Sequence, residues 1–162
     1  MYHIKSKITF MGATALVVAV LLFAFSQNGW AEAEGVKPVE VVASGTFNQT
    51  VDNVKTLVAK NGMMVMGEVN QGKMLSMTGL KLNGTTLFVG NPTVGKKLFS
   101  TDPGVGLVVP LRLYIFENKD GKTIISYYKP SELLAQYHNP EIDMVGKMLD
   151  EKLEKLTSMA AR

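Results

Sequence analysis

The segment Gly90-Asn91-Pro92-Thr93 has the most specific chemical pattern in the sequence. It separates a β-branched run from a helical pattern, so we expect it to begin a helix. The first N–H groups of a helix have no partners within the helix and attract anions, and Lys96 follows one turn later. These residues therefore predict a site for a small anionic molecule. The alternative is that Asn91 only caps the helix and Pro92 only begins it, and such caps are the commoner case.

Arg112 and Tyr127 are the two further candidates for this site. Arg112 follows Pro110 in an expected strand, and a guanidinium can bind an anion through paired hydrogen bonds. The alternative for Arg112 is a surface ion pair with Glu117 or Asp120. Tyr127 lies in the next expected strand, where an aromatic side chain suits a ligand wall or a dimer surface but more often belongs to the core.

Methionine and histidine offer a second chemistry. Met74 and Met77 are spaced for one face of a helix, and His138 is a further potential ligand. Thioethers suit Cu(I), so the alternative function is that of a metal-binding or redox-linked protein. Against it, methionine commonly fills irregular cores, and most methionines of this chain stand within apolar patterns. We therefore expect most of them to pack inside the protein and expect no bound cofactor.

His138 is also the one histidine after the leader that could act as a general base. Such a base needs an orienting carboxylate, and Glu141 and Asp143 are close in sequence. His138 nevertheless stands in an expected turn between helices, where a solvated residue is the usual case. The sequence also has no Gly-x-Ser-x-Gly segment. A small hydrolase is thus a weaker alternative to a protein without enzymatic activity.

The composition narrows these possibilities. The chain has 162 residues, 46% of them apolar, and a formal net charge of +3. This length suits one domain rather than two, and the charge is too small to indicate nucleic-acid binding. The absence of cysteine excludes disulfides, a thiolate nucleophile, Cys-ligated zinc and iron–sulfur clusters.

Residues 1–33 have the three parts of a secretory signal peptide. Two lysines precede an apolar run from Ile8 to Phe25, and a small-residue site with Ala31 and Ala33 follows. We expect cleavage after Ala33, with cleavage after Ala31 as the close alternative, which gives a periplasmic or secreted protein. The other alternative is an uncleaved membrane anchor, because an apolar run of this length can just span a bilayer.

The remaining residues alternate between strand and helix patterns. The expected strands are 39–43, 63–69, 85–89, 111–117 and 122–128. The expected helices begin near residues 47, 92, 130 and 140, and residues 70–79 hold an ambiguous short helix. The last two strands flank an Asp-Gly loop that is typical of a hairpin.

This order of elements indicates the α+β class. Because helices interleave with strands and one hairpin is clear, we expect one mixed sheet of about five strands. We expect the helices to pack on one face of it and form a two-layer sandwich. Residues 34–46 provide the lead-in and first strand, and residues 47–162 complete the single domain.

Several segments together resemble a known family. They are Leu87-Phe88-Val89-Gly90-Asn91-Pro92, Val109-Pro110-Leu111-Arg112, Asp120-Gly121-Lys122 with Ser126-Tyr127, and the Tyr127-x-x-Pro130 spacing. From about residue 47 to the C-terminus, the chain resembles the domain of unknown function 302 family. The family commonly has Leu where this chain has Val109, which keeps the apolar character of the position.

The resemblance implies a compact α+β domain, often paired as a dimer, with no established activity. Its motif residues in this chain are Gly90, Asn91, Pro92, Pro110, Arg112 and Tyr127. The sequence therefore predicts an exported binding or accessory domain for a small anionic molecule. We expect a homodimer that does not bind nucleic acid and that contacts a membrane only through an uncleaved leader.

Overall fold

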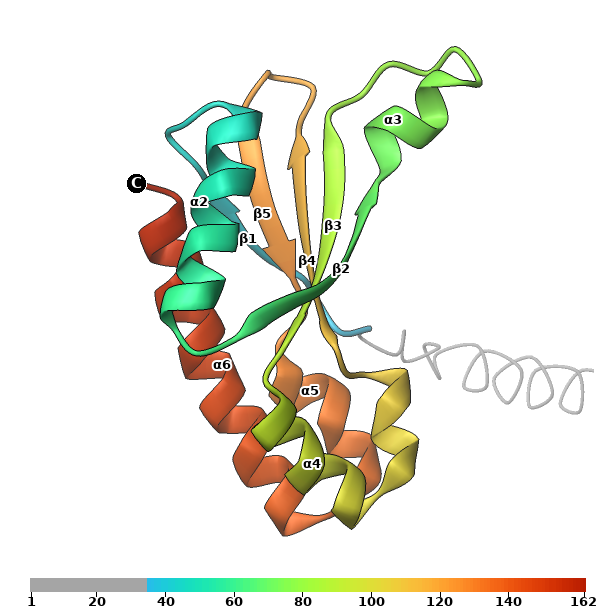
Figure 1. Ribbon diagram of the computed structural model, residues 1–162, viewed down its shortest axis with the longest axis vertical. Coiled ribbons are helices and arrows are strands. Elements are labelled where there is room, and N and C mark those ends of the chain that lie inside the picture. The colour runs from blue at the N-terminus through green and yellow to red at the C-terminus, as the bar shows by residue number, and fades with distance from the viewer. Residues whose placement is uncertain (1–34) are drawn as a thin grey trace, which may run out of the picture. The chain divides into compact units, whose positions relative to one another are not determined.

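The computed structural model describes residues 35–162, and Val36–Arg162 forms a compact unit. The predicted signal peptide, residues 1–33, lies outside the described residues. Five strands form one sheet in the order β1-β5-β4-β3-β2 (Figure 1). The strands are β1 (Val39–Val42), β2 (Met64–Asn70), β3 (Gly84–Gly90), β4 (Leu111–Glu117) and β5 (Thr123–Tyr127).

Five α-helices and two 3₁₀ turns complete the described fold. The α-helices are α2 (Phe47–Lys60), α3 (Gln71–Ser76), α4 (Pro92–Thr101), α5 (Pro130–Leu134) and α6 (Pro140–Ala160). The 3₁₀ turns are η1 (Pro103–Leu107) and η2 (Ala135–Tyr137). The predicted α+β class with a five-stranded sheet is confirmed, and the ambiguous stretch at 70–79 contains the short helix α3.

Local side-chain chemistry explains where the longer helices begin. Thr46 caps α2 in a reciprocal capping box with Gln49. Asn91 and Asn139 each accept two backbone N–H groups at the starts of α4 and α6, and a proline follows each asparagine. Proline tolerates the first helical position because its missing N–H would have no partner within the helix.

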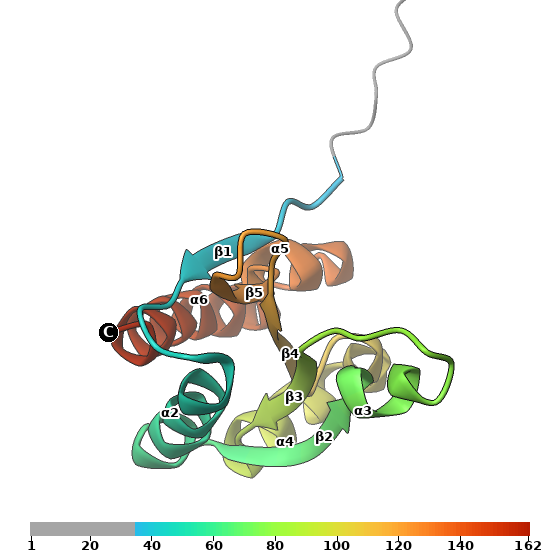
Figure 2. The same ribbon diagram turned by 90° about the horizontal axis from the view of Figure 1, so that it is seen from above.

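The core lies between one face of the sheet and the helices α2 and α6 (Figures 1 and 2). Alternate residues of the central strands point into this core, and Leu87 pairs with Leu113 across β3 and β4. Val54 and Val58 from α2 and Leu153 from α6 meet these strands and are fully buried. The helices cover this face because their apolar side chains recur with the 3.6-residue period of a helix and so lie on one side. The apolar side chains of the strands recur at every second residue and face them.

The direction of the strands corrects the prediction of a mixed sheet. All four strand pairs are antiparallel. Parallel neighbours need a connection that crosses the length of the sheet. The segments with α3 and with α4 instead return the chain to the end of the sheet that it left, so the next strand runs back along its neighbour (Figure 1). A helix between two strands therefore did not imply a parallel pair here.

The short helix α3 is an exception to the prediction that the helices pack on one face. The first residue of α3, Gln71, donates a hydrogen bond from Nε2 to Thr86 Oγ1 at 2.6 Å. Thr86 lies on the face of β3 opposite to that of its buried neighbour Leu87, because successive strand residues point to opposite faces. Viewed from above, α3 lies across the sheet from α2 (Figure 2).

The methionines also differ from expectation. Met63 is buried, but the other seven methionines of residues 35–162 are exposed. Met66 is 49% exposed and lies at a bulge between Val65 and Gly67, where the pairing of β2 is disrupted. Core packing therefore accounts for one methionine, and the others contribute apolar, flexible side chains to the surface.

Candidate functional site

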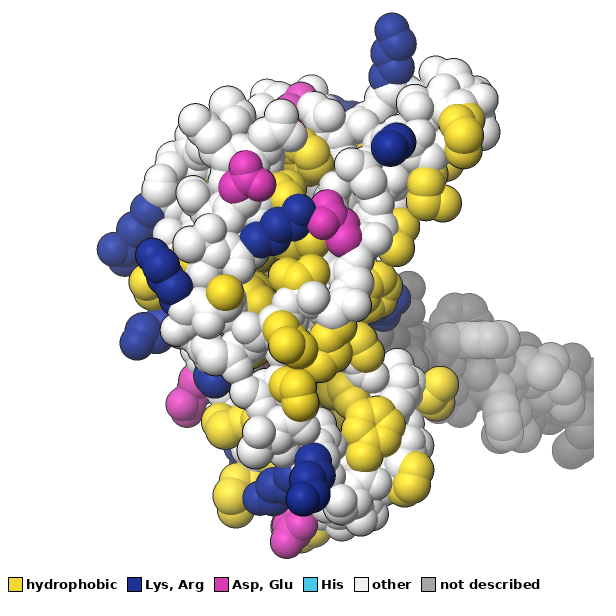
Figure 3. Space-filling view, in the orientation of Figure 1, with side chains coloured by type: hydrophobic (Ala, Val, Ile, Leu, Met, Phe, Trp, Pro, Cys, Tyr) yellow, Lys and Arg dark blue, Asp and Glu magenta, His cyan; other side chains and the backbone are white. Residues whose placement is uncertain are grey.

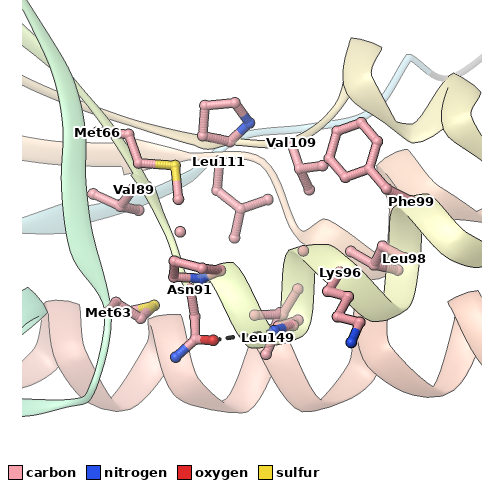
Figure 4. A pocket seen from close by; sticks show the side chains of 15 residues that line it. Met63, Met66, Val89, Asn91, Lys96, Leu98, Phe99, Val109, Leu111 and Leu149 are labelled. Carbon is pink, nitrogen blue, oxygen red and sulfur yellow. Dashed lines mark hydrogen bonds between the residues drawn. The ribbon is translucent and has the colours of Figure 1, made fainter.

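A pocket of about 390 Å³ lies where β3 passes into α4 (Figure 4). Its walls come from β2, β3, α4, α6 and the segment that enters β4. Apolar side chains provide most of the lining: Met63, Met66, Val89, Pro92, Val94, Leu98, Phe99, Val109, Pro110, Leu111 and Leu149. The space-filling view shows hydrophobic side chains gathered between the sheet and α4, with Lys or Arg side chains beside them (Figure 3). Its size and lining are those of a small-molecule site.

Gly90 allows the pocket wall to close around Met66. A Cβ atom built on Gly90 would lie 3.0 Å from Met66 Cε and 3.9 Å from Pro110 Cβ. Any larger residue at this position would therefore compete with Met66 for space. The thioether side chain is flexible and partly exposed, so it suits a wall that adjusts to a ligand.

Asn91 occupies the N–H groups that we predicted to bind an anion. Its Oδ1 atom accepts hydrogen bonds from the backbone N–H of Thr93 at 2.8 Å and of Val94 at 3.0 Å. The N–H of Gly95 donates to the Asn91 carbonyl at 2.8 Å, and Pro92 has no N–H. The side-chain amide of Asn91 also donates to the Gly62 carbonyl at 2.5 Å. The first turn of α4 thus has no free backbone donor to offer an anion.

Lys96 is the charged residue of this pocket. It is exposed, and it forms no ion pair within residues 35–162. Figure 4 shows its ammonium directed away from Leu111 and Phe99, while its stem lines the pocket. A lysine can place its apolar stem against a hydrophobic wall and keep its charge in water. The pocket therefore combines an apolar interior with one positive charge at its edge.

The structure separates Thr93, Arg112 and Tyr127 from this pocket. Thr93 lines a smaller apolar groove, of about 230 Å³, with Met144 and Met148 of α6. Arg112 and Tyr127 line a different pocket, on the other side of the sheet, that shares no residue with the first. The predicted six residues therefore do not form one site.

Tyr127 belongs mainly to the core. It is only 5% exposed, and its hydroxyl hydrogen-bonds with Thr157 of α6. Burial raises the pKa of Tyr127 above its ordinary value of 10.0, and the nearby carboxylates of Glu154 and Asp150 raise it further, whereas the Thr157 hydrogen bond lowers it. The hydroxyl therefore stays protonated and neutral near pH 7.

The residues of the metal hypothesis lie far apart in the fold. Met74 on α3 and Met77 just after it are exposed at one end of the domain. His138 follows η2, between α5 and α6, at the other end (Figure 1). Within residues 35–162 no group of three or more His, Cys, Asp or Glu residues is arranged to hold a metal ion. The two exposed methionines and His138 therefore cannot ligate one ion together.

Comparison with known proteins places this fold in a family. The family model for "Domain of unknown function DUF302" matches residues 39–160, which is most of the chain. The chain belongs to the DUF302 family. A crystal structure of an uncharacterized conserved DUF302 protein from Bacillus stearothermophilus has the same fold, with a TM-score of 0.72 at 20% sequence identity. The match covers 79% of this chain and all of that one.

Similar sequence also occurs in longer proteins with a named function. The chain is 30% identical over 102 residues to "Fluoride-specific ion channel FluC 1" of Brucella suis and to the channel of the same name of Brucella abortus. The matches cover 62% of this chain and only 40% and 37% of the channels, so the chain spans about two fifths of these relatives. In the described part of this chain, no helix is long and apolar enough to cross a membrane.

Four of the six motif residues by which the sequence resembles the DUF302 family lie at the first pocket, whereas Arg112 and Tyr127 line the other one. Gly90, Asn91 and Pro92 form its floor at the start of α4, and Pro110 approaches from the strand-entry segment. These residues could be singled out from the sequence because Gly, Asn and Pro mark the boundaries of strands and helices. The sequence did not reveal the walls, which come from Met66, Phe99 and other common apolar residues that only the fold brings together.

Proposed function

We propose that this DUF302 domain is an exported binding or accessory domain without enzymatic activity, and that its pocket beside α4 binds an apolar molecule with a negatively charged end. One observation supports this most directly. A pocket of about 390 Å³ has apolar walls and a single unpaired cation, Lys96, at its edge. An elongated carboxylate would bury its hydrocarbon part and leave its charge near the lysine.

The position of the charge revises the hypothesis drawn from the sequence. Because Asn91 and its backbone already satisfy the first N–H groups of α4, the helix start does not bind the anionic end. Lys96 does, one turn farther along the helix. The binding free energy comes mainly from burial of apolar surface, at about 25 cal/mol per Å², and the exposed charge adds a smaller, salt-sensitive part.

The Brucella channels support an accessory role. Sequence similar to 102 residues of this chain occurs within longer proteins named as fluoride-specific channels. A segment of this kind within a transport protein suits a sensing or binding task better than a catalytic one. Fluoride itself lacks an apolar part, so we expect it to bind this pocket far more weakly than a fatty carboxylate.

The test measures thermal unfolding of Val36–Arg162, which forms a compact unit and has the fold that makes up the whole chain of the Bacillus protein. Decanoate should raise the unfolding temperature, decanol should raise it less, and acetate or sodium fluoride should have no effect. Ligand at a hundredfold excess over its Kd stabilises a folded protein by about 2.7 kcal/mol, which corresponds to several degrees for a domain of this size.

Two pairs of variants locate the site. Lys96→Gln should reduce the decanoate effect to that of decanol, and Lys97→Gln, at an adjacent exposed lysine outside this pocket, should not. A Cβ on Gly95 meets no atom within 4 Å, so Gly95→Phe should fill the pocket and abolish binding, whereas Gly95→Ala should preserve it. Equal decanoate binding by Gly95→Phe and Gly95→Ala would show that the ligand lies elsewhere.

A further inference from the structure

The face of the sheet opposite α2 and α6, which only α3 covers in part and which we call the uncovered face, contains a second pocket of about 370 Å³. It is separate from the pocket beside α4 and has a different lining. Part of its lining comes from strand residues that point away from the core: Thr86, Arg112, Tyr114 and Ser126. Gln71 of α3 and Tyr128 line its sides. Hydroxyl groups, aromatic rings and a guanidinium therefore face one hollow.

Arg112 has no acidic partner in this hollow. It is exposed and forms no ion pair within residues 35–162. Glu117, the partner that the sequence allowed, lies five residues along the same strand and accepts a hydrogen bond from Asn83 at 3.3 Å. Glu40 lies on the edge strand β1, and its carboxylate is not part of the pocket lining. The guanidinium is therefore free to bind a carboxylate through two parallel hydrogen bonds.

Gln71 supplies an unsatisfied acceptor to the same pocket. Its Nε2 group donates to Thr86 Oγ1, but its Oε1 atom is buried and has no hydrogen-bond partner among the described residues. Buried polar atoms normally have a partner, and one that lacks it is a reason to look for a missing ligand group. The complementary group is an O–H or N–H donor.

Two aromatic side chains provide flat walls. Tyr114 stacks on Phe116 with ring centroids 5.0 Å apart and an interplanar angle of 12°, which fixes the orientation of the Tyr114 ring. Tyr128 lines the pocket too and is 40% exposed. Offset-stacked and edge-to-face contacts with such rings favour a planar, aromatic ligand.

The distance between Arg112 and the polar end of the pocket at Thr86 limits the size of the ligand. Thr86 pairs with Tyr114, and Arg112 is two residues before Tyr114 on the same strand, so Thr86 and Arg112 are diagonal neighbours. Diagonal neighbours lie roughly 7–8 Å apart. A benzene ring with a carboxylate and a donor at opposite positions spans a similar distance.

We propose that this pocket is a second ligand site, which binds a small aromatic carboxylate that also bears a hydrogen-bond donor. The carboxylate binds Arg112, the ring lies against Tyr114 and Tyr128, and the donor reaches Gln71 Oε1. This site does not depend on the function proposed for the pocket beside α4, because the two pockets share no residue.

Isothermal titration of Val36–Arg162 with 4-hydroxybenzoate tests the proposal. Benzoate lacks the donor and should bind about tenfold more weakly than 4-hydroxybenzoate. The alcohol 4-hydroxybenzyl alcohol lacks the charge, and its affinity should be lower still. Inorganic phosphate and acetate lack the ring and should not bind measurably. Binding of phosphate as tight as that of 4-hydroxybenzoate would overturn the proposal, because the site would then be a simple anion site.

Variants at Arg112 and Gln71 test whether the ligand binds in this pocket. Arg112→Gln should abolish binding, Arg112→Lys should weaken it because lysine cannot form the paired hydrogen bonds, and Gln71→Leu should remove the preference for 4-hydroxybenzoate over benzoate. Lys96→Gln is the matched control in the other pocket and should bind as the parent does. Loss of binding in Lys96→Gln, or no binding by the parent, would overturn the proposal.

The size of the protein in solution gives an independent check. Light scattering should show that ligand binding leaves the oligomeric state unchanged and that Arg112→Gln has the same mass as the parent. A parent dimer that dissociates in Arg112→Gln would show instead that a second copy covers this face, and the ligand site would be wrong.

Discussion

The two faces of the sheet differ in what their side chains contact. On the covered face, Leu87, Leu113 and Ile125 are fully buried against α2 and α6. On the uncovered face, Arg112 and Tyr114 alternate with them along the same strands but line a pocket instead of a core. The same strands thus contribute apolar side chains to the core on one face and polar and aromatic side chains to a pocket on the other. Substitutions on the two faces should therefore affect different measurements.

Neighbouring residues of β4 provide the largest expected difference. Leu113→Ala removes a fully buried side chain and leaves a cavity, so we expect it to lower the free energy of unfolding by about 2–5 kcal/mol. Arg112→Ala, one residue away on the uncovered face, should change it by about 0.5 kcal/mol or less. Equilibrium urea unfolding of both variants measures this, and losses of similar size would mean that the second face is also covered in solution.

Two helical glycines extend the comparison from side chains to the backbone. A Cβ on Gly146 of α6 would lie 2.8 Å from Ser131 Cα, so Gly146→Ala must push α5 and α6 apart and should cost about 1–3 kcal/mol. Gly95→Ala adds a methyl group where no atom lies within 4 Å, and should stabilise α4 by about 0.5–1 kcal/mol. Opposite shifts in unfolding temperature are the expected result, and a stabilising Gly146→Ala would contradict the close packing.

Local chemistry made the covered part of the molecule predictable from sequence. The caps Thr46, Asn91 and Asn139 act on backbone groups within three residues, and such local signals allowed helices to be predicted from near residues 47, 92 and 140. The residue pattern likewise predicted a strand at 111–117, and the structure shows that Leu113 lies on its buried face.

The pockets depend on contacts between distant segments, so the sequence did not reveal their composition. Met66 meets Gly90 only because a bulge interrupts β2, and Gln71 reaches Thr86 only because α3 lies across the sheet from α2. Arg112 and Lys96, which we predicted to share one site, lie apart for the same reason. Leu111 lines the pocket of Lys96, but the next residue of β4, Arg112, points to the opposite face of the sheet. Residue types identified candidates, but the fold decided which candidates are neighbours.

Ionisation of Tyr127 should have the smallest effect on the free energy of unfolding and gives the most specific test of the covered face. The pKa of Tyr127 is raised mainly by burial, so the folded protein binds this proton more tightly than the unfolded chain does. Its contribution to stability is present below pH 10 and is lost as the pH rises from about 10 through the folded-state pKa. We therefore expect the free energy of unfolding of the parent to fall more steeply above pH 10 than that of Tyr127→Phe.

The phenylalanine variant also separates ionisation from packing. Near pH 7, Tyr127→Phe loses only the hydrogen bond with Thr157, which costs about 1 kcal/mol. Urea unfolding at pH 7 and at several values above pH 10 should then show the variant approaching the parent as the pH rises. Tyr128→Phe, at a 40% exposed position, is the control and should follow the parent across the range. A constant difference between Tyr127→Phe and the parent at every pH would mean that the hydroxyl ionises as easily in the folded domain as in the unfolded chain, and hence that α6 does not seal this end of the covered face.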